Sequence, residues 1–125
     1  MDLPRGSETV LLVDDDPNIL ETSGMMLSAL GYTVLKAISG QEALKLWQES
    51  DQVDIVLTDL TMPDMDGREV LARLREEGYG GPVALLSGYS LPVEERRGFV
   101  GVLTKPFRLA DLAGTIRSFL EEESG

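Results

Sequence analysis

The chain has 125 residues, a length that fits a single domain with one hydrophobic core. Acidic residues outnumber basic ones by 22 to 11, and the formal charge of −11 opposes direct binding to DNA or RNA. The absence of histidine and cysteine excludes disulfides, Cys/His zinc sites and any Ser-His-Asp triad. No apolar run approaches the roughly 20 residues of a membrane span, and no signal peptide is evident. We therefore expect a cytoplasmic domain that does not itself insert into a membrane.

Strand-like and helix-like segments alternate five times along the chain. We predict strands at 9–13, 33–37, 54–58, 82–86 and 100–104. We predict helices from Pro17 to a stop at Gly31, then at 41–49, 67–77 and 109–122. The stretch 90–97 lies where another helix belongs, but its pattern is weak.

The segments 9–13, 54–58 and 82–86 are continuous apolar runs, as expected for strands covered on both faces. Parallel strands need crossover helices, so the pattern predicts an α/β fold, a three-layer sandwich around a parallel sheet. Ligands of such sheets bind beyond the carboxyl ends of the strands. The residues that follow each strand are therefore the candidates for function.

The two ends of the chain lack this periodicity. Residues 1–7, MDLPRGS, are interpreted either as a remnant of an expression tag or as an interdomain linker. We expect the domain to span residues 8–122 and residues 123–125 to form a tail.

Polar residues gather at the predicted strand ends. They are Asp14, Asp15, Asp16, Asp59, Ser87 and Lys105. Each has an ordinary structural explanation when taken alone, such as a helix cap for Asp16 or a turn for Ser87. A sheet that brings these strand ends together would instead crowd several carboxylates, which is unfavourable unless a cation intervenes.

The chemistry of these groups favours Mg²⁺ and a phosphoryl group. Carboxylate oxygens without histidine or cysteine suit a hard divalent cation. Lys105 supplies a positive charge and Ser87 a hydroxyl donor, both suited to phosphoryl oxygens. Asp59, alone at the end of the central strand, is the acid best placed to attack phosphorus.

Four motifs occur in an order that resembles the receiver domain of two-component response regulators. They are VLLVDDDP, DIVLTDLTMPDMDG, ALLSG and LTKPF. The resemblance covers about residues 8–122 and implies a flavodoxin-like, five-stranded sheet in the order 2-1-3-4-5.

The resemblance also implies roles for single residues. Asp59 corresponds to the phosphoacceptor, and Asp14 and Asp15 to the acidic pair that binds Mg²⁺ together with Asp59. Thr61 would contribute its backbone carbonyl to the metal. Asp16 corresponds to a third acid in the run, to which we assign helix capping and no metal.

The resemblance implies further roles for residues in and beside the motifs ALLSG and LTKPF. Ser87, Gly88 and Lys105 would stabilise the phosphoryl group, and Pro106 would follow a cis peptide bond. Ser87, Tyr89 and Val102 occupy the positions that couple phosphorylation to a conformational switch.

Two departures from the family pattern stand out. The interval from Ser87 to Lys105 is short, so we expect the fourth helix to be short or absent. Val102 stands where receivers usually carry an aromatic residue, and Tyr89 or Phe99 is a candidate substitute. Both changes bear on signal output and leave the phosphorylation residues complete.

The expected function is a phosphoacceptor that takes a phosphoryl group from a histidine kinase or phosphotransfer domain onto Asp59 and then changes conformation. Such a domain is not an enzyme beyond its own Mg²⁺-dependent phosphorylation and dephosphorylation, and we expect a monomer or weak dimer. The chain is similar to receivers at the C-terminus of hybrid sensor histidine kinases, a context in which the domain would be tethered to a membrane-bound sensor. A stand-alone receiver and the N-terminal part of a transcription regulator remain open.

Two alternative hypotheses compete with a phosphoacceptor function. One is a degenerate receiver that serves only as an interaction module. The other is a phosphatase of the haloacid dehalogenase kind, for which Asp14-x-Asp16 fits but Pro17-Asn18 does not. A third resemblance, of the segment from Asp64 to Gly67 to a calcium loop, lacks its first ligand because Met62 stands there. We interpret that segment as a loop entering a helix.

Overall fold

A computed structural model describes residues 3–124 of the chain. The strands are β1 (Thr9–Val13), β2 (Thr33–Ala37), β3 (Ile55–Asp59), β4 (Val83–Ser87) and β5 (Gly101–Thr104). The α-helices are α1 (Pro17–Ala29), α2 (Gly40–Glu49), α3 (Gly67–Glu76) and α4 (Leu109–Ser124), and a single 3-10 helix, η1 (Val93–Arg96), precedes β5. None of the described helices combines the length and apolar character that a membrane crossing requires.

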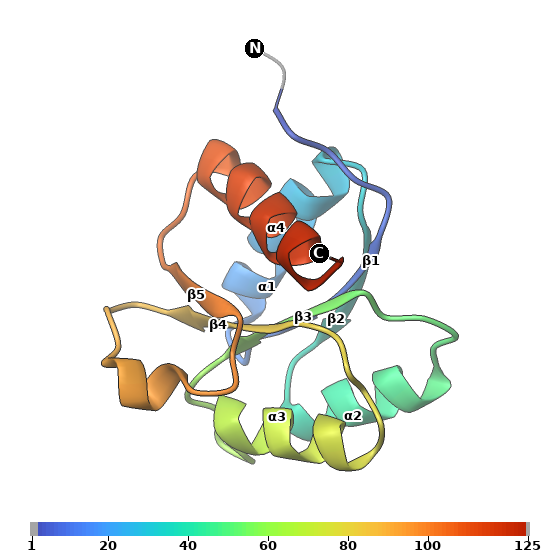
Figure 1. The fold of residues 1–125 in the computed structure, drawn as a ribbon, viewed down its shortest axis with the longest axis vertical. Helices are drawn as coiled ribbons and strands as arrows, with labels where there is room; N and C mark the ends of the chain where they lie inside the picture. The colour runs from blue at the N-terminus through green and yellow to red at the C-terminus, as the bar shows by residue number, and fades with distance from the viewer. Residues whose placement is uncertain (1–2, 125) are drawn as a thin grey trace.

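The five strands form one parallel sheet in the order β2-β1-β3-β4-β5. Helices α1 and α4 cover one face of the sheet, and α2 and α3 cover the other (Figure 1). The predicted three-layer α/β sandwich and the 2-1-3-4-5 order are both confirmed. Because β1 and β3 pair directly, with Val13 opposite Thr58, their carboxyl ends lie side by side.

The core is divided by the sheet into two layers. Successive residues of β1 point to opposite faces, so Val10 and Leu12 join the α1–α4 layer while Leu11 and Val13 join the α2–α3 layer. All four side chains are almost fully buried, and each contributes about 1.5–3 kcal/mol of hydrophobic free energy. This double burial explains why the central strands are continuously apolar.

The region between β4 and β5 contains only the four residues of η1 as helix. The expectation of a short or missing fourth helix is confirmed. Leu91, just before η1, packs with Leu60 and Leu85 in a small third cluster. Gly98, with a positive φ of 89°, turns the chain back towards β5.

Polar side chains cap three of the α-helices. Asp16 accepts hydrogen bonds from the N–H groups of Asn18 and Ile19 at the start of α1, as the capping assignment predicted. Ser39 caps α2, and Asp66 caps α3. At the other end of α1, Gly31 adopts a φ of 101°, a conformation suited to glycine.

The segment before β1 packs on the α1–α4 side of the domain. Leu3 contacts the core of that layer, and the Gly6 N–H donates to the Leu30 carbonyl over 3.1 Å. Glu8 binds Arg117 of α4, whose Nη1 lies 2.8 and 2.9 Å from the two carboxylate oxygens. The same nitrogen lies 3.5 Å from the hydroxyl of Tyr32. Residues 3–8 thus make ordered contacts that the lack of periodicity gave no reason to expect.

Candidate functional site

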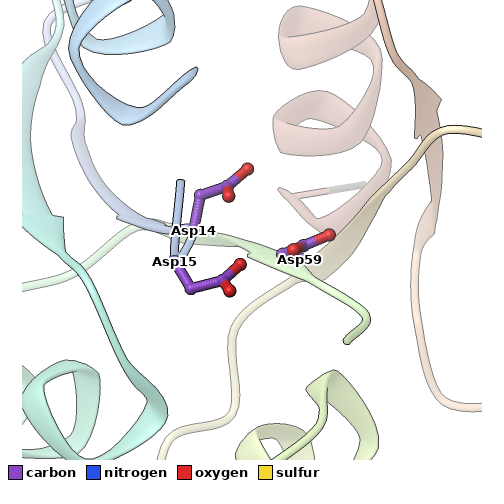
Figure 2. A group of neighbouring side chains, drawn as sticks. All are labelled: Asp14, Asp15 and Asp59. Carbon is purple, nitrogen blue, oxygen red and sulfur yellow. The ribbon is translucent and has the colours of Figure 1, made fainter. Parts of the chain in front are cut away.

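Three aspartates meet where β1 and β3 end. Asp14 and Asp15 follow β1, and Asp59 is the last residue of β3. One carboxylate oxygen from each lies within 4.8 Å of the other two. Figure 2 shows Asp14 and Asp15 adjacent on the first segment with Asp59 across from them on its neighbour. The direct pairing of β1 with β3 produces this grouping of residues that are 45 positions apart.

Lys105 joins this cluster from the end of β5. Its backbone N–H donates to the Ser87 carbonyl over 2.6 Å, which continues the pairing of β4 and β5. Its side chain then reaches Asp14 Oδ2 at 3.0 Å and Asp59 Oδ1 at 3.2 Å. The peptide bond between Lys105 and Pro106 is cis.

The electrostatics of the cluster are unbalanced. Burial raises the pKa of Asp59 above its ordinary value, and the neighbouring charges of Asp14 and Asp15 add to the rise, while Lys105 opposes it. Burial acts to lower the pKa of Lys105, but its bonds to Asp14 and Asp59 outweigh this and raise that pKa. One cation therefore faces three acids, and Asp14 is only 1% exposed.

This donor set fits a magnesium ion. The groups are carboxylate oxygens only, and the surplus negative charge is what a divalent cation would neutralise. Mg²⁺ typically takes one or two protein carboxylates and leaves positions for water and phosphate oxygens. Asp14, Asp15 and Asp59 are the residues that would hold it.

Ser87 is buried at the end of β4, but its hydroxyl is engaged elsewhere. Ser87 Oγ donates to the Tyr89 carbonyl over 2.8 Å and accepts from the Tyr89 N–H over 3.2 Å. Gly88 and Thr61 are exposed near the same edge of the sheet, on the loops that follow β4 and β3. The structure thus joins Asp14, Asp15, Asp59 and Lys105 directly and places Ser87, Gly88 and Thr61 on neighbouring segments.

The two residues assigned to coupling lie in different environments. Val102 is partly buried on β5 and packs against the third cluster, as does Phe99. Tyr89 is 61% exposed, so its ring lies at the surface beside the Ser87 turn.

An apolar cavity of about 410 Å³ borders the cluster. It lies between α1 and the loop after β5, with Ile19, Met26 and Phe107 among its lining residues, and Lys105 at one side.

The fold and this arrangement of acids and lysine define a receiver domain. Residues 10–117 match the family described as "Response regulator receiver domain", and the chain belongs to that family.

The relatives include both kinases and transcription regulators. The chain is 40% identical over 126 residues to the sensor kinase CckA of Brucella abortus, a match that covers 94% of this chain and 13% of the kinase. It is 36% identical over 119 residues to the transcriptional regulatory protein GlrR of Escherichia coli, covering 92% of this chain and 27% of GlrR. The chain thus spans only a small part of these relatives.

Solved structures agree in fold. The chemotaxis protein CheY4 of Vibrio cholerae superposes with a TM-score of 0.83 at 30% identity, covering 92% of this chain and all of CheY4. The receiver domain of the hybrid histidine kinase CckA gives 0.77 at 31% identity, with 90% and 98% covered. The response regulator TrrA of Thermotoga maritima, solved in complex with Mg²⁺-BeF, gives 0.77 at 29% identity, with 90% and 99% covered.

Proposed function

We propose that the domain accepts a phosphoryl group on Asp59 from a phosphohistidine, with Mg²⁺ held by Asp14, Asp15, Asp59 and the backbone carbonyl of Thr61. The observation that carries this proposal is an aspartate whose side chain is 15% exposed, with a lysine at 3.2 Å and two further acids beside it. The chain has no histidine, so the donor is a histidine kinase or phosphotransfer domain outside these residues.

The chemical step is a displacement at phosphorus. A carboxylate oxygen of Asp59 forms a bond to phosphorus while the bond from phosphorus to the donor's imidazole nitrogen breaks, and that nitrogen keeps the electron pair. Lys105 opposes the rise in the pKa of Asp59 and so favours the ionised, nucleophilic carboxylate. Bound Mg²⁺ would neutralise charge on the transferring oxygens.

The chain's own groups then stabilise the product. The Lys105 ammonium, now bonded to Asp14 and Asp59, is close enough to bind a phosphoryl oxygen on Asp59. Ser87 and the N–H of Gly88 supply further donors from the end of β4. A Ser87 hydroxyl that turns to the phosphoryl group must leave the Tyr89 carbonyl, so phosphorylation releases the turn at Ser87 and Tyr89. That release is the proposed conformational switch. It would involve Val102, which packs against the cluster of Leu60, Leu85 and Leu91.

The parent context is also a proposal. We infer that the domain serves as a receiver attached to a hybrid sensor kinase at the cytoplasmic side, supported by the 40% identity to CckA. The apolar cavity beside Lys105 is the proposed contact surface for the phosphodonor. Direct contact with nucleic acid is disfavoured by the charge of −11.

Intact-mass spectrometry tests the phosphorylation. Incubation with Mg²⁺ and acetyl phosphate is expected to add one phosphoryl group to the wild type, and none to Asp59→Asn or to wild type with EDTA. Asp16→Asn is the matched control, because Asp16 lies in the same acidic run but caps α1, and it is expected to be modified like the wild type.

Other outcomes separate the alternatives. A wild type that binds Mg²⁺ but gains no mass would favour a degenerate interaction module. Many turnovers of an added phosphomonoester would favour a phosphatase.

A further inference from the structure

The loop from Leu60 to Asp66, between β3 and α3, is fastened to the start of α2 by Asp64. Asp64 Oδ2 accepts the Gln41 N–H over 2.9 Å, and Asp64 Oδ1 accepts the Gly40 N–H over 3.2 Å. These N–H groups belong to the first turn of α2 and have no partner inside the helix. Although slight burial acts the other way, these bonds lower the pKa of Asp64, in keeping with a carboxylate held by N–H donors.

A second contact fixes the same loop on α2. Met65 is buried, and its side chain lies so close to Gly40 that a methyl group there would collide with it. Glycine at position 40 therefore allows the loop to approach the helix. The polar contact of Asp64 and the apolar contact of Met65 act at the same point.

The two ends of this loop meet at the phosphoacceptor. The Leu60 N–H donates to Asp59 Oδ1 over 3.0 Å, so the loop backbone touches the carboxylate itself. At the far end, the Gly67 N–H donates to the Leu60 carbonyl over 2.7 Å. A Cβ atom at Gly67 would lie 2.8 Å from the Asp59 carbonyl oxygen, so the loop closes tightly on β3. A shift of the loop at Asp64 is thus passed to the orientation of the Asp59 carboxylate.

We propose that Asp64 is a positioning residue for the acceptor site: by anchoring the loop to α2, it sets the orientation of Asp59 and the affinity of the site for Mg²⁺. Within residues 3–124, Asp64 makes no side-chain bond to Lys105, Asp14, Asp15 or Asp59, and it acts through Leu60. The phosphorylation part of this inference rests on the proposed function, whereas the Mg²⁺ affinity does not.

The test compares Asp64→Ala with Ser39→Ala. Both variants remove side-chain acceptors from the first turn of α2: Asp64→Ala removes the bonds from Gly40 and Gln41, and Ser39→Ala removes the bond from Glu42 over 3.1 Å. Within the described part of the chain, Ser39 makes no side-chain bond to the loop. Titration with Mg²⁺ alone, followed by the backbone amide signals of Asp15 and Leu60 in NMR spectra, measures the affinity. Asp64→Ala is expected to weaken Mg²⁺ binding about fivefold, the factor in an equilibrium constant that one lost capping interaction represents.

Phosphorylation kinetics give a second readout. With acetyl phosphate, Asp64→Ala is expected to slow phosphorylation most at low Mg²⁺ and to recover much of the rate when Mg²⁺ saturates. Asp64→Asn keeps one acceptor oxygen and is expected to lie between wild type and Asp64→Ala. Ser39→Ala is expected to match the wild type in both measurements.

Two results would overturn the proposal. In one, Asp64→Ala is folded, as its NMR spectrum shows, yet binds Mg²⁺ like the wild type. In the other, Ser39→Ala weakens Mg²⁺ binding as much as Asp64→Ala, which would assign the effect to α2 alone. A wild type that binds Mg²⁺ but accepts no phosphoryl group would contradict the proposed function, and the affinity comparison would still decide the role of Asp64.

Discussion

At each end of the sheet a mostly buried basic side chain lies among acidic ones, and the two groups differ in how far their acids are shielded from water. At the carboxyl ends, Lys105 faces Asp14 and Asp59 with Asp15 beside them. At the amino ends, Arg117 binds Glu8 through both carboxylate oxygens and also pairs with the exposed Glu121 over 3.2 Å.

The pKa values of the two acids move in opposite directions. Burial and neighbouring acids raise the pKa of Asp59. Burial also acts to raise the pKa of Glu8, but its hydrogen bond to Arg117 outweighs this and lowers that pKa. Water screens the exposed Glu121, so the Glu8–Arg117 pair has little uncompensated charge, whereas the acids around Lys105 are crowded together and Asp14 and Asp59 are largely shielded from water. Crowded acids that are shielded from water are therefore the feature that separates the candidate site from a structural ion pair.

The largest expected effect is that of Lys105→Met on the rate of phosphorylation, and Arg117→Ala serves as its comparison. Lys105→Met is expected to slow phosphorylation by acetyl phosphate about 100-fold, because one preorganised donor to the phosphoryl oxygens is lost. Arg117→Ala is expected to leave that rate unchanged. Rapid-quench assays followed by intact mass measure both. Equal losses in the two variants would show that the rate reflects stability and not the site.

Arg117→Ala, which is expected to leave the phosphorylation rate unchanged, is expected to lower the stability of the fold. Arg117→Ala should lower the free energy of unfolding at pH 7 by about 1–2 kcal/mol, because Glu8 and Tyr32 lose a partly buried partner. The folded-state pKa of Glu8 lies below the ordinary glutamate value of 4.5, so this stabilisation is present above pH 4.5 and is lost as the pH falls through the folded value. Urea denaturation at pH 7 and pH 3 measures the difference, which should shrink in acid.

Arg73→Ala is the matched control for that experiment. Arg73 pairs with Glu69 on an exposed surface of α3, with both side chains about half exposed. Its removal is expected to cost only a few tenths of a kcal/mol. A cost equal to that of Arg117→Ala would contradict the role of the cluster at the amino ends.

Magnesium should stabilise the domain through the acidic cluster alone. At a free concentration ten times its Kd, Mg²⁺ is expected to raise the free energy of unfolding by about 1.4 kcal/mol. Arg117→Ala should keep this gain, and Asp59→Asn should lose most of it. Thermal denaturation with and without Mg²⁺ is the measurement, with Ca²⁺-free buffer and EDTA as the baseline.

A smaller effect than that of magnesium is expected for Asp59 itself in the absence of metal. Because the folded-state pKa of Asp59 is raised, its ionised form destabilises the fold, and that cost appears as the pH rises above the ordinary value of 3.8. Asp59→Asn should therefore be more stable than the wild type at pH 7 by about 0.5–1 kcal/mol. The difference should disappear below pH 3.8. A variant less stable than the wild type at pH 7 would mean that the Lys105 bond outweighs the repulsion.

Local patterns in the sequence account for most of the fold and for the acidic cluster. The bounds predicted for the first two strands were correct, and β3 and β4 begin and end one residue later than predicted. The later ends follow from strand pairing: Asp59 pairs with Leu86 and Ser87 pairs with Thr104, each one residue beyond the apolar run. Asp14, Asp59 and Lys105 were found because parallel strands bring their carboxyl ends to one edge.

Contacts between distant segments were not predictable in the same way. The bonds of Asp64 to Gly40 and Gln41 join a loop to a helix more than 20 positions earlier, and no local pattern marks them. The same holds for Glu8 and Arg117, which are 109 positions apart. The interpretation of the segment from Asp64 to Gly67 as a loop entering a helix therefore did not include its contacts with α2.

The hydrogen bond between Gly6 and Leu30, with the contact of Leu3 before it, affects how far a phosphodonor in the same polypeptide must reach to meet Asp59. These contacts fix the entry of the chain at the amino ends of the strands, whereas Asp59 lies at the carboxyl end of β3. β1 has 5 residues, so the two ends of the strands are separated by roughly 16 Å at about 3.3 Å per residue. A histidine tethered ahead of residue 3 must travel around the domain by at least this distance, whereas a donor on a separate molecule meets no such limit. Tether length would thus decide between transfer within one chain and transfer between chains.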